Sequence, residues 1–344
     1  MALLSSFISG VAGEAMTGDE WRFFQDARPC GLILFRRNCQ HPAQVKALVN
    51  AFKDAIGSDD LLVLIDQEGG RVQRLQPPHW RVLPPPASFG ELYREDADFA
   101  TSAARSIAQV TAMDLRALGI NTNCAPVLDL PVPGITDAIG DRAFGPDLDM
   151  IIELGKAVAE GLLHGGVLPV MKHLPGHGRA LQDSHKVLPT VAATLDELAD
   201  SDFVPFRALK NLPIGMTAHI LFTDIDRNSP ATTSRLVIET IIRKDIGFEG
   251  LLLSDDLSMN ALGGTPADRA RAVTSAGCDV VLHCNGKLDE MQAVAASVPL
   301  LEGASHDRYA AALARRSAPE TFDVSEALDT IAEVLAITGE RDTI

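Results

Sequence analysis

Residues 250–256 read GLLLSDD, a run of three leucines that ends in a serine and two aspartates. A short, continuous apolar run of this kind predicts a strand buried on both faces, as in a parallel sheet. A charge at the end of a buried strand is costly unless it is paired or used. The stretch therefore predicts a parallel sheet with a functional carboxylate at its edge.

Seven further apolar runs share this pattern, at 3–10, 31–35, 61–66, 120–130, 166–173, 214–222 and 278–284. Amphipathic stretches of helical length separate them, at 43–56, 97–118, 151–164, 195–210, 234–244 and 266–275. Thr194 and Glu197 have the spacing of a capping box at the start of one of these helices. Eight strands alternating with helices predict an α/β fold, a single (β/α)8 TIM-type barrel. The remaining 285–344 stretch is expected to be helical, so residues 1–344 are expected to form one catalytic barrel domain.

The composition of the chain excludes several classes of protein. A net charge of −16 argues against a nucleic-acid partner, which requires a basic face. No apolar run approaches the roughly 20 residues that span a membrane, so no membrane partner is expected. The N-terminus has no Lys or Arg before Arg22, which favours a first strand over a signal peptide. The five cysteines form no C-x-x-C pair and are expected to be buried thiols in a cytoplasmic protein.

In a barrel of this type, the active site lies where the strands end. Polar residues occupy these positions in most of the predicted strands: Asp66, Asp129, Lys172, His173, His219, Asp255, Asp256 and His283. Asp255 and Asp256 are adjacent on a strand, so we expect only one of them to face the barrel mouth. A carboxylate there is a candidate nucleophile, base or metal ligand, whereas Asp256 also suits a helix cap.

Two other segments present candidate binding groups. In DQEGGRVQR (66–74), the glycine pair permits a tight turn, Asp66 can accept hydrogen bonds from adjacent hydroxyls, and Arg74 can donate them. A structural Asp66–Arg74 pair is the alternative, and no dinucleotide-binding fingerprint is present. In AIGDRAFG (138–145), Arg142 is a weaker candidate. The proline-rich loop 76–88 either walls a cleft or packs outside the barrel.

The segment KHLPGHGRALQDSH (172–185) is the richest in titratable groups. Lys172 and His173 lie at a rigid strand end, and the Asp183–His185 pair follows on a loop. A carboxylate that accepts the imidazole Nδ1–H leaves Nε2 free for proton transfer and raises the pKa of the histidine. The alternative is a loop-capping aspartate beside an exposed histidine. We expect His177 to brace the loop through hydrogen bonds without taking part in the chemistry.

The candidate residues are compatible with three classes of enzyme. His173, His177 and Asp255 could bind zinc, although Pro175 and Gly176 prevent the helix that the histidine spacing suits. Lys172 could form a Schiff base, but this requires a desolvated lysine. The third class is glycoside hydrolysis, with one nucleophilic carboxylate and one acid/base. A non-catalytic sugar-binding barrel is the non-enzyme alternative.

The motifs DQEGGRVQR, GDRAF, KHLPGHG, DSH and SDDLSM occur in this order at predicted strand ends. Together they closely resemble the bacterial β-N-acetylhexosaminidases of glycoside hydrolase family 3, of the single-domain peptidoglycan-recycling type. The resemblance implies Asp255 as the nucleophile and His185 as the general acid/base, with Asp183 as its partner. It also implies that terminal N-acetylglucosamine is bound by Asp66, Arg74, Arg142, Lys172 and His173.

The resemblance further implies a retaining exo-β-N-acetylglucosaminidase that needs no metal or organic cofactor. Its substrates would be N-acetylglucosaminyl-1,6-anhydro-muropeptides in the cytoplasm, and we expect a monomer. Leu174 and the pair Arg179–Ala180 depart from the family pattern, in which Asp-Thr often takes the latter place. The departure makes the contacts of Arg179 an open question.

Overall fold

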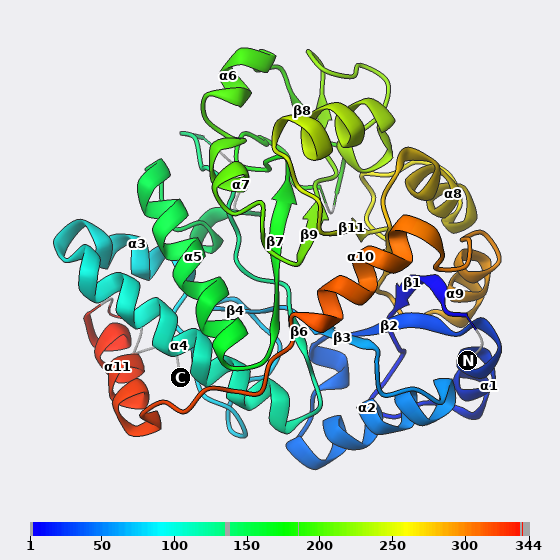
Figure 1. Cartoon of the computed structure of the whole chain (residues 1–344), viewed down its shortest axis with the longest axis horizontal. Coiled ribbons are helices and arrows are strands. Elements are labelled where there is room, and N and C mark those ends of the chain that lie inside the picture. The colour runs from blue at the N-terminus through cyan, green and yellow to red at the C-terminus, as the bar shows by residue number, and fades with distance from the viewer. Residues whose placement is uncertain (1–2, 135–137, 185, 338, 340–344) are drawn as a thin grey trace.

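The computed structural model describes residues 3–134, 138–184, 186–337 and 339. Within them, eight parallel strands close into a barrel in the order β1-β12-β11-β9-β7-β6-β3-β2 (Figure 1). The strands are β1 (Ser5–Ser9), β2 (Pro29–Leu34), β3 (Leu62–Ile65), β6 (Thr122–Asn123), β7 (Leu168–Leu174), β9 (Ile214–Thr217), β11 (Leu251–Asp256) and β12 (Val280–His283). Each overlaps one predicted run, so the (β/α)8 barrel is confirmed.

Alternation along each strand separates two apolar layers. On β11, Leu251 and Leu253 pack inside the barrel with residues such as Leu282 of β12. Leu252 and Val281 point outward into the layer between the barrel and its helices. Because both faces are buried, the strands consist almost entirely of apolar residues, which is why the sequence pattern revealed them.

The helices surround the barrel, as Figure 1 shows. They include α1 (Gly18–Ala27), α2 (Pro42–Ile56), α3 (Pro86–Glu95), α4 (Ala97–Ala117), α5 (Leu148–His164), α8 (Pro266–Ala276) and α9 (Leu288–Ala295). Side-chain caps fix several of their starts: Asp96 accepts a hydrogen bond from the backbone of Phe99, and Asp147 from that of Met150. Such caps satisfy backbone N–H groups that the first helical turn leaves without partners.

The prediction of one helix over 195–210 is wrong. The segment forms two short helices, α6 (Leu195–Ala199) and α7 (Val204–Ala208). Thr194 and Glu197 make the expected capping box at the start of α6. Pro205 lies in the first turn of α7, where its missing N–H is tolerated, but it cannot continue a helix from α6. The predicted helix at 234–244 is a π-helix, η4 (Val237–Asp245).

Two predicted strands are longer than those observed. In the run 120–130, the regular strand β6 ends at Asn123, and Pro126 has no N–H to donate to the sheet. Pairing with β7 resumes at an isolated parallel bridge between Val127 and Lys172. In the run 214–222, β9 ends at Thr217. Its last residues form β10 (Leu221–Phe222), which pairs with β8 (Thr190–Val191) in a separate two-stranded sheet.

The C-terminal segment closes one end of the barrel. Helix α10 (Gly303–Ala314) lies across the end where the strands begin, and the Tyr309 hydroxyl donates to the carbonyl of Cys30 at 2.7 Å. Helix α11 (Val324–Ile337) packs against α4 (Figure 1). No helix in the described part of the chain is long and apolar enough to cross a membrane.

Candidate active site

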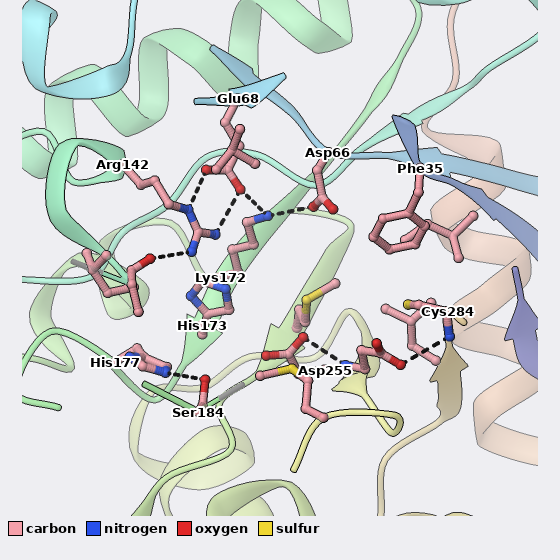
Figure 2. A pocket seen from close by; sticks show the side chains of 18 of the residues that line it. Phe35, Asp66, Glu68, Arg142, Lys172, His173, His177, Ser184, Asp255 and Cys284 are labelled. Carbon is pink, nitrogen blue, oxygen red and sulfur yellow. Dashed lines mark hydrogen bonds and ion pairs between the residues drawn. The ribbon is translucent and has the colours of Figure 1, made fainter. Parts of the chain in front are cut away.

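A cavity of about 440 Å³ opens at the end of the barrel where the strands finish (Figure 2). Its size suits a small-molecule ligand. Seven of the eight predicted site residues border it: Asp66, Arg74, Arg142, Lys172, His173, Asp183 and Asp255. The eighth, His185, lies outside the described residues.

Strand alternation explains why three of these side chains reach the cavity. On β11, Leu251 and Leu253 face the barrel interior, and Asp255 takes the next inward position. Lys172 on β7 and Asp66 just after β3 continue the inward rows of their strands in the same way. The peptide bond between Lys172 and His173 is cis.

Lys172 joins two carboxylates at the cavity wall. Its Nζ lies 3.0 Å from Asp66 Oδ1 and 2.5 Å from Glu68 Oε1 (Figure 2). Arg74 donates to the other oxygen of Asp66 at 2.9 Å. Arg142 donates to both oxygens of Glu68, at 2.8 Å from Nε and 2.9 Å from Nη2. The five side chains form one charge-assisted network, and its Arg142–Glu68 pair has the bidentate geometry that arginine favours.

The network keeps its members charged. Burial alone would raise the pKa of Asp66 and Glu68, but their cationic neighbours outweigh burial and hold each carboxyl pKa below its ordinary value. Burial opposes the charge of Lys172 as well, yet Asp66 and Glu68 raise the pKa of its ammonium. Burial likewise opposes the charge of Arg142, yet Glu68 raises the pKa of its guanidinium. The wall therefore presents fixed donors and acceptors that suit a polar ligand rich in hydroxyl groups.

Glu68 is the network member that sequence reasoning missed. It lies on the strand β4 (Gln67–Gly69), which pairs with β5 (Val72–Gln73) in a hairpin. Its side chain is 1% exposed, although its neighbours in sequence suggested only a turn. One signal was available: a glutamate two residues after Asp66 lies on the same side of an extended chain.

The proline-rich loop 76–88 supports this hairpin from behind. Gly70 donates its N–H to the carbonyl of Leu83 at 2.9 Å. Gly69 has a φ of 104°, and a side chain there would run into the carbonyl of Pro84. None of the loop's residues borders the 440 Å³ cavity, so the loop packs outside the barrel mouth.

Asp255 and Asp256 differ in their surroundings. The backbone N–H of Asp256 donates to Asp255 Oδ1 at 2.8 Å. Burial would raise the pKa of Asp255, but His219, His173 and this N–H lower it, so the carboxylate is ionised. The Asp256 carboxylate accepts hydrogen bonds from the backbone N–H groups of Ser258 and Cys284. Both residues border the cavity, so the expectation that only one faces the mouth is wrong, but Asp256 is occupied in the turn.

His173 is held from behind by Asp129. Its Nδ1 lies 2.7 Å from Asp129 Oδ2, and its backbone N–H donates to Asp129 Oδ1 at 3.2 Å. Burial would raise the pKa of Asp129, but His173 outweighs burial and lowers it. An ionised Asp129 therefore lies directly behind a residue of the cavity wall.

His177 makes hydrogen bonds that connect the strand end to the following loop, as expected. Its backbone N–H donates to Asp129 at 2.7 Å, and its Nε2 lies 3.2 Å from Ser184 Oγ (Figure 2). Burial and the neighbouring His173 lower the pKa of His177 to about 4, so its ring is neutral at pH 7. The Nδ1 atom has no hydrogen-bond partner among the described residues.

Asp183 borders the cavity from the loop after β7. Its carbonyl accepts hydrogen bonds from Lys186 and Val187, and its carboxylate lies 3.6 Å from Lys186 Nζ. Arg179, the departure from the family pattern, donates to Asp202 at 2.6 Å and to Ser201 at 3.0 Å. Arg179 thus fastens the start of this loop to the segment between α6 and α7.

An aromatic ring that the sequence did not single out completes one side of the cavity. Phe35 follows β2, and the guanidinium carbon of Arg74 lies 5.1 Å from the centre of its ring. This cation–π contact fixes the orientation of Arg74 beside Asp66.

Within residues 3–134, 138–184, 186–337 and 339, no three His, Cys, Asp or Glu side chains are grouped so as to hold a metal ion. The candidate ligands His173 and His177 have their hydrogen bonds to Asp129 and Ser184 instead. Four of the five cysteines are buried, and burial raises the pKa of thiols such as Cys30 and Cys284.

Comparison with known proteins identifies the class of this barrel. Residues 11–315 match the glycosyl hydrolase family 3 N terminal domain. A β-hexosaminidase of Thiobacillus denitrificans is 40% identical over 286 residues, covering 82% of this chain and 79% of that protein. The β-hexosaminidase of Methylobacillus flagellatus is 38% identical over 296 residues, covering 84% of each chain.

A solved structure agrees with these sequences. NagZ from Neisseria gonorrhoeae in complex with N-trifluoroacetyl-D-glucosamine has a TM-score of 0.87 and 32% identity, over 96% of this chain and 98% of that chain. This chain therefore belongs to glycoside hydrolase family 3. Within that family it is a β-N-acetylhexosaminidase, as its motifs predicted.

Proposed function

We propose that the protein is a retaining exo-β-N-acetylglucosaminidase that works through a covalent intermediate on Asp255. The observation that carries this proposal is the position of the Asp255 carboxylate, which borders the cavity of about 440 Å³ together with a wall of fixed polar groups. The lowered pKa of this carboxyl supports it. An ionised carboxylate on an inward strand position suits attack on an anomeric carbon. The neighbouring Asp256 is occupied by the turn, which supports Asp255 as the nucleophile.

In the first step, an oxygen of Asp255 forms a bond to the anomeric carbon while the bond to the leaving-group oxygen breaks. His185, protonated with Asp183 as its partner, gives its proton to that oxygen. In the second step, neutral His185 takes a proton from water, the water oxygen bonds to the anomeric carbon, and Asp255 is released. After donating its proton, an imidazole adds no second negative charge near Asp255, as a carboxylate would.

The wall network suits the terminal sugar. Asp66, Arg74, Arg142, Lys172 and His173 are proposed to bind N-acetylglucosamine. Arg142 and Lys172 are already held by Glu68, so they need little reorganisation when a ligand arrives. The Neisseria gonorrhoeae NagZ structure, which contains N-trifluoroacetyl-D-glucosamine, supports an N-acylated glucosamine as the ligand class.

We further propose that the natural substrates are N-acetylglucosaminyl-1,6-anhydro-muropeptides, recycled in the cytoplasm by a monomer with one catalytic domain. The resemblance of the motifs supports this choice. Purified protein should release N-acetylglucosamine from such muropeptides faster than from a chitin disaccharide. Equal rates on both, measured by chromatography, would contradict the assigned substrate.

Turnover of a chromogenic N-acetyl-β-glucosaminide tests the catalytic assignment. Asp255→Asn should abolish turnover, and exhaustive chelation should leave the wild-type rate unchanged. On a substrate whose leaving group needs a proton, His185→Gly should slow both steps, and added azide or formate should restore part of the rate. Full activity in His185→Gly would refute its role as acid/base, and activity lost on chelation would favour a metal-dependent hydrolase.

A further inference from the structure

A buried carboxylate behind the cavity wall organises the strand end that carries His173. Asp129 is 0% exposed and does not border the cavity, yet three N–H groups converge on it. We propose that Asp129 is a positioning residue that keeps the ring proton of His173 on Nδ1, so that Nε2 meets the sugar as a hydrogen-bond acceptor. This inference rests on the proposed function for its ligand, and it extends the reaction to a residue outside the cavity.

The hydrogen bonds fix the location of the proton. A carboxylate can only accept, so the His173 Nδ1 that lies 2.7 Å from Asp129 Oδ2 must carry a hydrogen. Asp129 Oδ1 is committed elsewhere, because it accepts the backbone N–H groups of His177 at 2.7 Å and His173 at 3.2 Å. These backbone hydrogen bonds hold the Asp129 carboxylate in place. The position of the carboxylate in turn fixes the orientation of the His173 ring.

The remaining ring nitrogen is left for a ligand. His173 borders the cavity, and its Nε2 makes no hydrogen bond to another described residue. With the proton on Nδ1, a neutral ring offers a lone pair at Nε2. The adjacent Lys172 can only donate. A single sugar hydroxyl can then donate to His173 and accept from Lys172, which fixes its direction as well as its place.

An amide at position 129 would reverse this arrangement. In Asp129→Asn, the amide oxygen would stay with the two backbone N–H groups, since these need an acceptor. The amide nitrogen would then take the place of Oδ2 and donate to His173 Nδ1, which forces the ring proton to Nε2. A substitution of this kind keeps the shape of the site while it inverts the tautomer, as is known for an Asp–His pair in serine proteases.

The test compares the full chain as wild type, Asp129→Asn, His173→Ala and the double variant. Nitrogen-15 NMR of the histidine rings should show His173 protonated at Nδ1 in the wild type and at Nε2 in Asp129→Asn. On a chromogenic N-acetyl-β-glucosaminide, Asp129→Asn should lower kcat/KM by about 10- to 100-fold, the size of loss seen when the hydrogen-bond partner of a metal-bound histidine is removed. In the His173→Ala background, Asp129→Asn should lower kcat/KM by a much smaller factor.

Asp279→Asn is the matched control, because Asp279 is also buried and accepts a backbone N–H, from Leu252, at the opposite end of the barrel. It should lower stability without changing kcat/KM. The proposal is overturned by an Nε2–H or doubly protonated His173 in the wild type. It is also overturned by an unchanged kcat/KM in Asp129→Asn, or by an equal loss with and without His173. The NMR measurement does not depend on turnover. It therefore tests the tautomer of His173 separately from the proposed hydrolysis.

Discussion

The side chain of Lys172 is 2% exposed and lies between two carboxylates, that of Glu68, which is 1% exposed, and that of Asp66, which is 14% exposed. Taking three charges out of water is costly, and a buried ion pair is weak evidence of stability. The benefit is preorganisation, because donors and acceptors already in place need not reorient when charge develops in the transition state. Glu68 holds both Lys172 and Arg142, as Asp66 holds both Lys172 and Arg74.

At this scale, Glu68→Gln tests the network. A neutral amide leaves two buried cations with one anion fewer, so the free energy of unfolding should fall by about 3 kcal/mol. Turnover should fall as well, because Lys172 and Arg142 lose their fixed positions. Urea denaturation and steady-state kinetics measure the two effects.

Asp19→Asn provides the control for Glu68→Gln, because the Asp19–Arg22 pair is more than two-thirds exposed on both sides. Its loss should change stability by less than about 1 kcal/mol. A Glu68→Gln variant as stable and active as this control would show that the network is not needed.

Among the elements, the β4–β5 hairpin has a role beyond that of a turn. It carries Glu68, and Asp66 and Arg74 flank it, so its position decides where three members of the network lie. The proline-rich loop fixes it from behind through the Gly70–Leu83 hydrogen bond. Close backbone contact between hairpin and loop requires residues without side chains.

Gly69→Ala should therefore displace the hairpin. The added methyl group would meet the carbonyl of Pro84 and would also place alanine at a φ of 104°. Overpacking and the left-handed backbone conformation together should lower the free energy of unfolding by about 2–4 kcal/mol. KM for the chromogenic substrate should rise as well. Gly13→Ala is the control, because nothing lies within 4 Å of its added methyl group. Equal behaviour of the two variants in thermal unfolding would contradict this account of the hairpin.

For the whole molecule, buried carboxylates determine the response to acid. The pKa values of Asp66, Glu68, Asp129 and Asp255 are all lower in the folded protein than their ordinary range of about 4. A lowered pKa contributes stability that is fully present above the unfolded value and is lost as pH falls toward the folded value. Asp114 and Asp202, whose pKa values burial raises, oppose this effect.

We therefore expect the free energy of unfolding to fall gradually from pH 7 to pH 5, because buried His177, with a pKa of about 4, takes up its proton later than a histidine of the unfolded chain does. It should then fall steeply below about pH 4, where the carboxylates are protonated. The Glu68→Gln variant should show a shallower fall, because it has lost one of the responsible groups. Urea denaturation across this pH range measures both slopes. A wild-type protein whose stability rises below pH 4 would contradict the charged state assigned to the cavity wall.

Much of this molecule could be predicted from its sequence, for reasons that individual residues make plain. Strands buried on both faces, such as β11, leave an unmistakable apolar run, and alternation along it places Asp255 inside the barrel. Glu68 and Asp129 escaped assignment because their partners lie far away in the chain, 74 residues away in the case of Arg142 and 44 in that of His173. Local patterns carry no information about such pairings. Pro205, by contrast, was a visible sign of the helix break that the periodicity alone concealed.

The covalent intermediate on Asp255 is the central claim, and trapping it is the most direct test. His185→Gly should react quickly with a dinitrophenyl N-acetyl-β-glucosaminide, because this leaving group needs no proton, and should then hydrolyse slowly for want of a base. Mass spectrometry should find one N-acetylglucosaminyl group per chain, on the peptide that contains Asp255. A sugar attached to another residue, or turnover of this substrate with no adduct on the protein, would contradict the account.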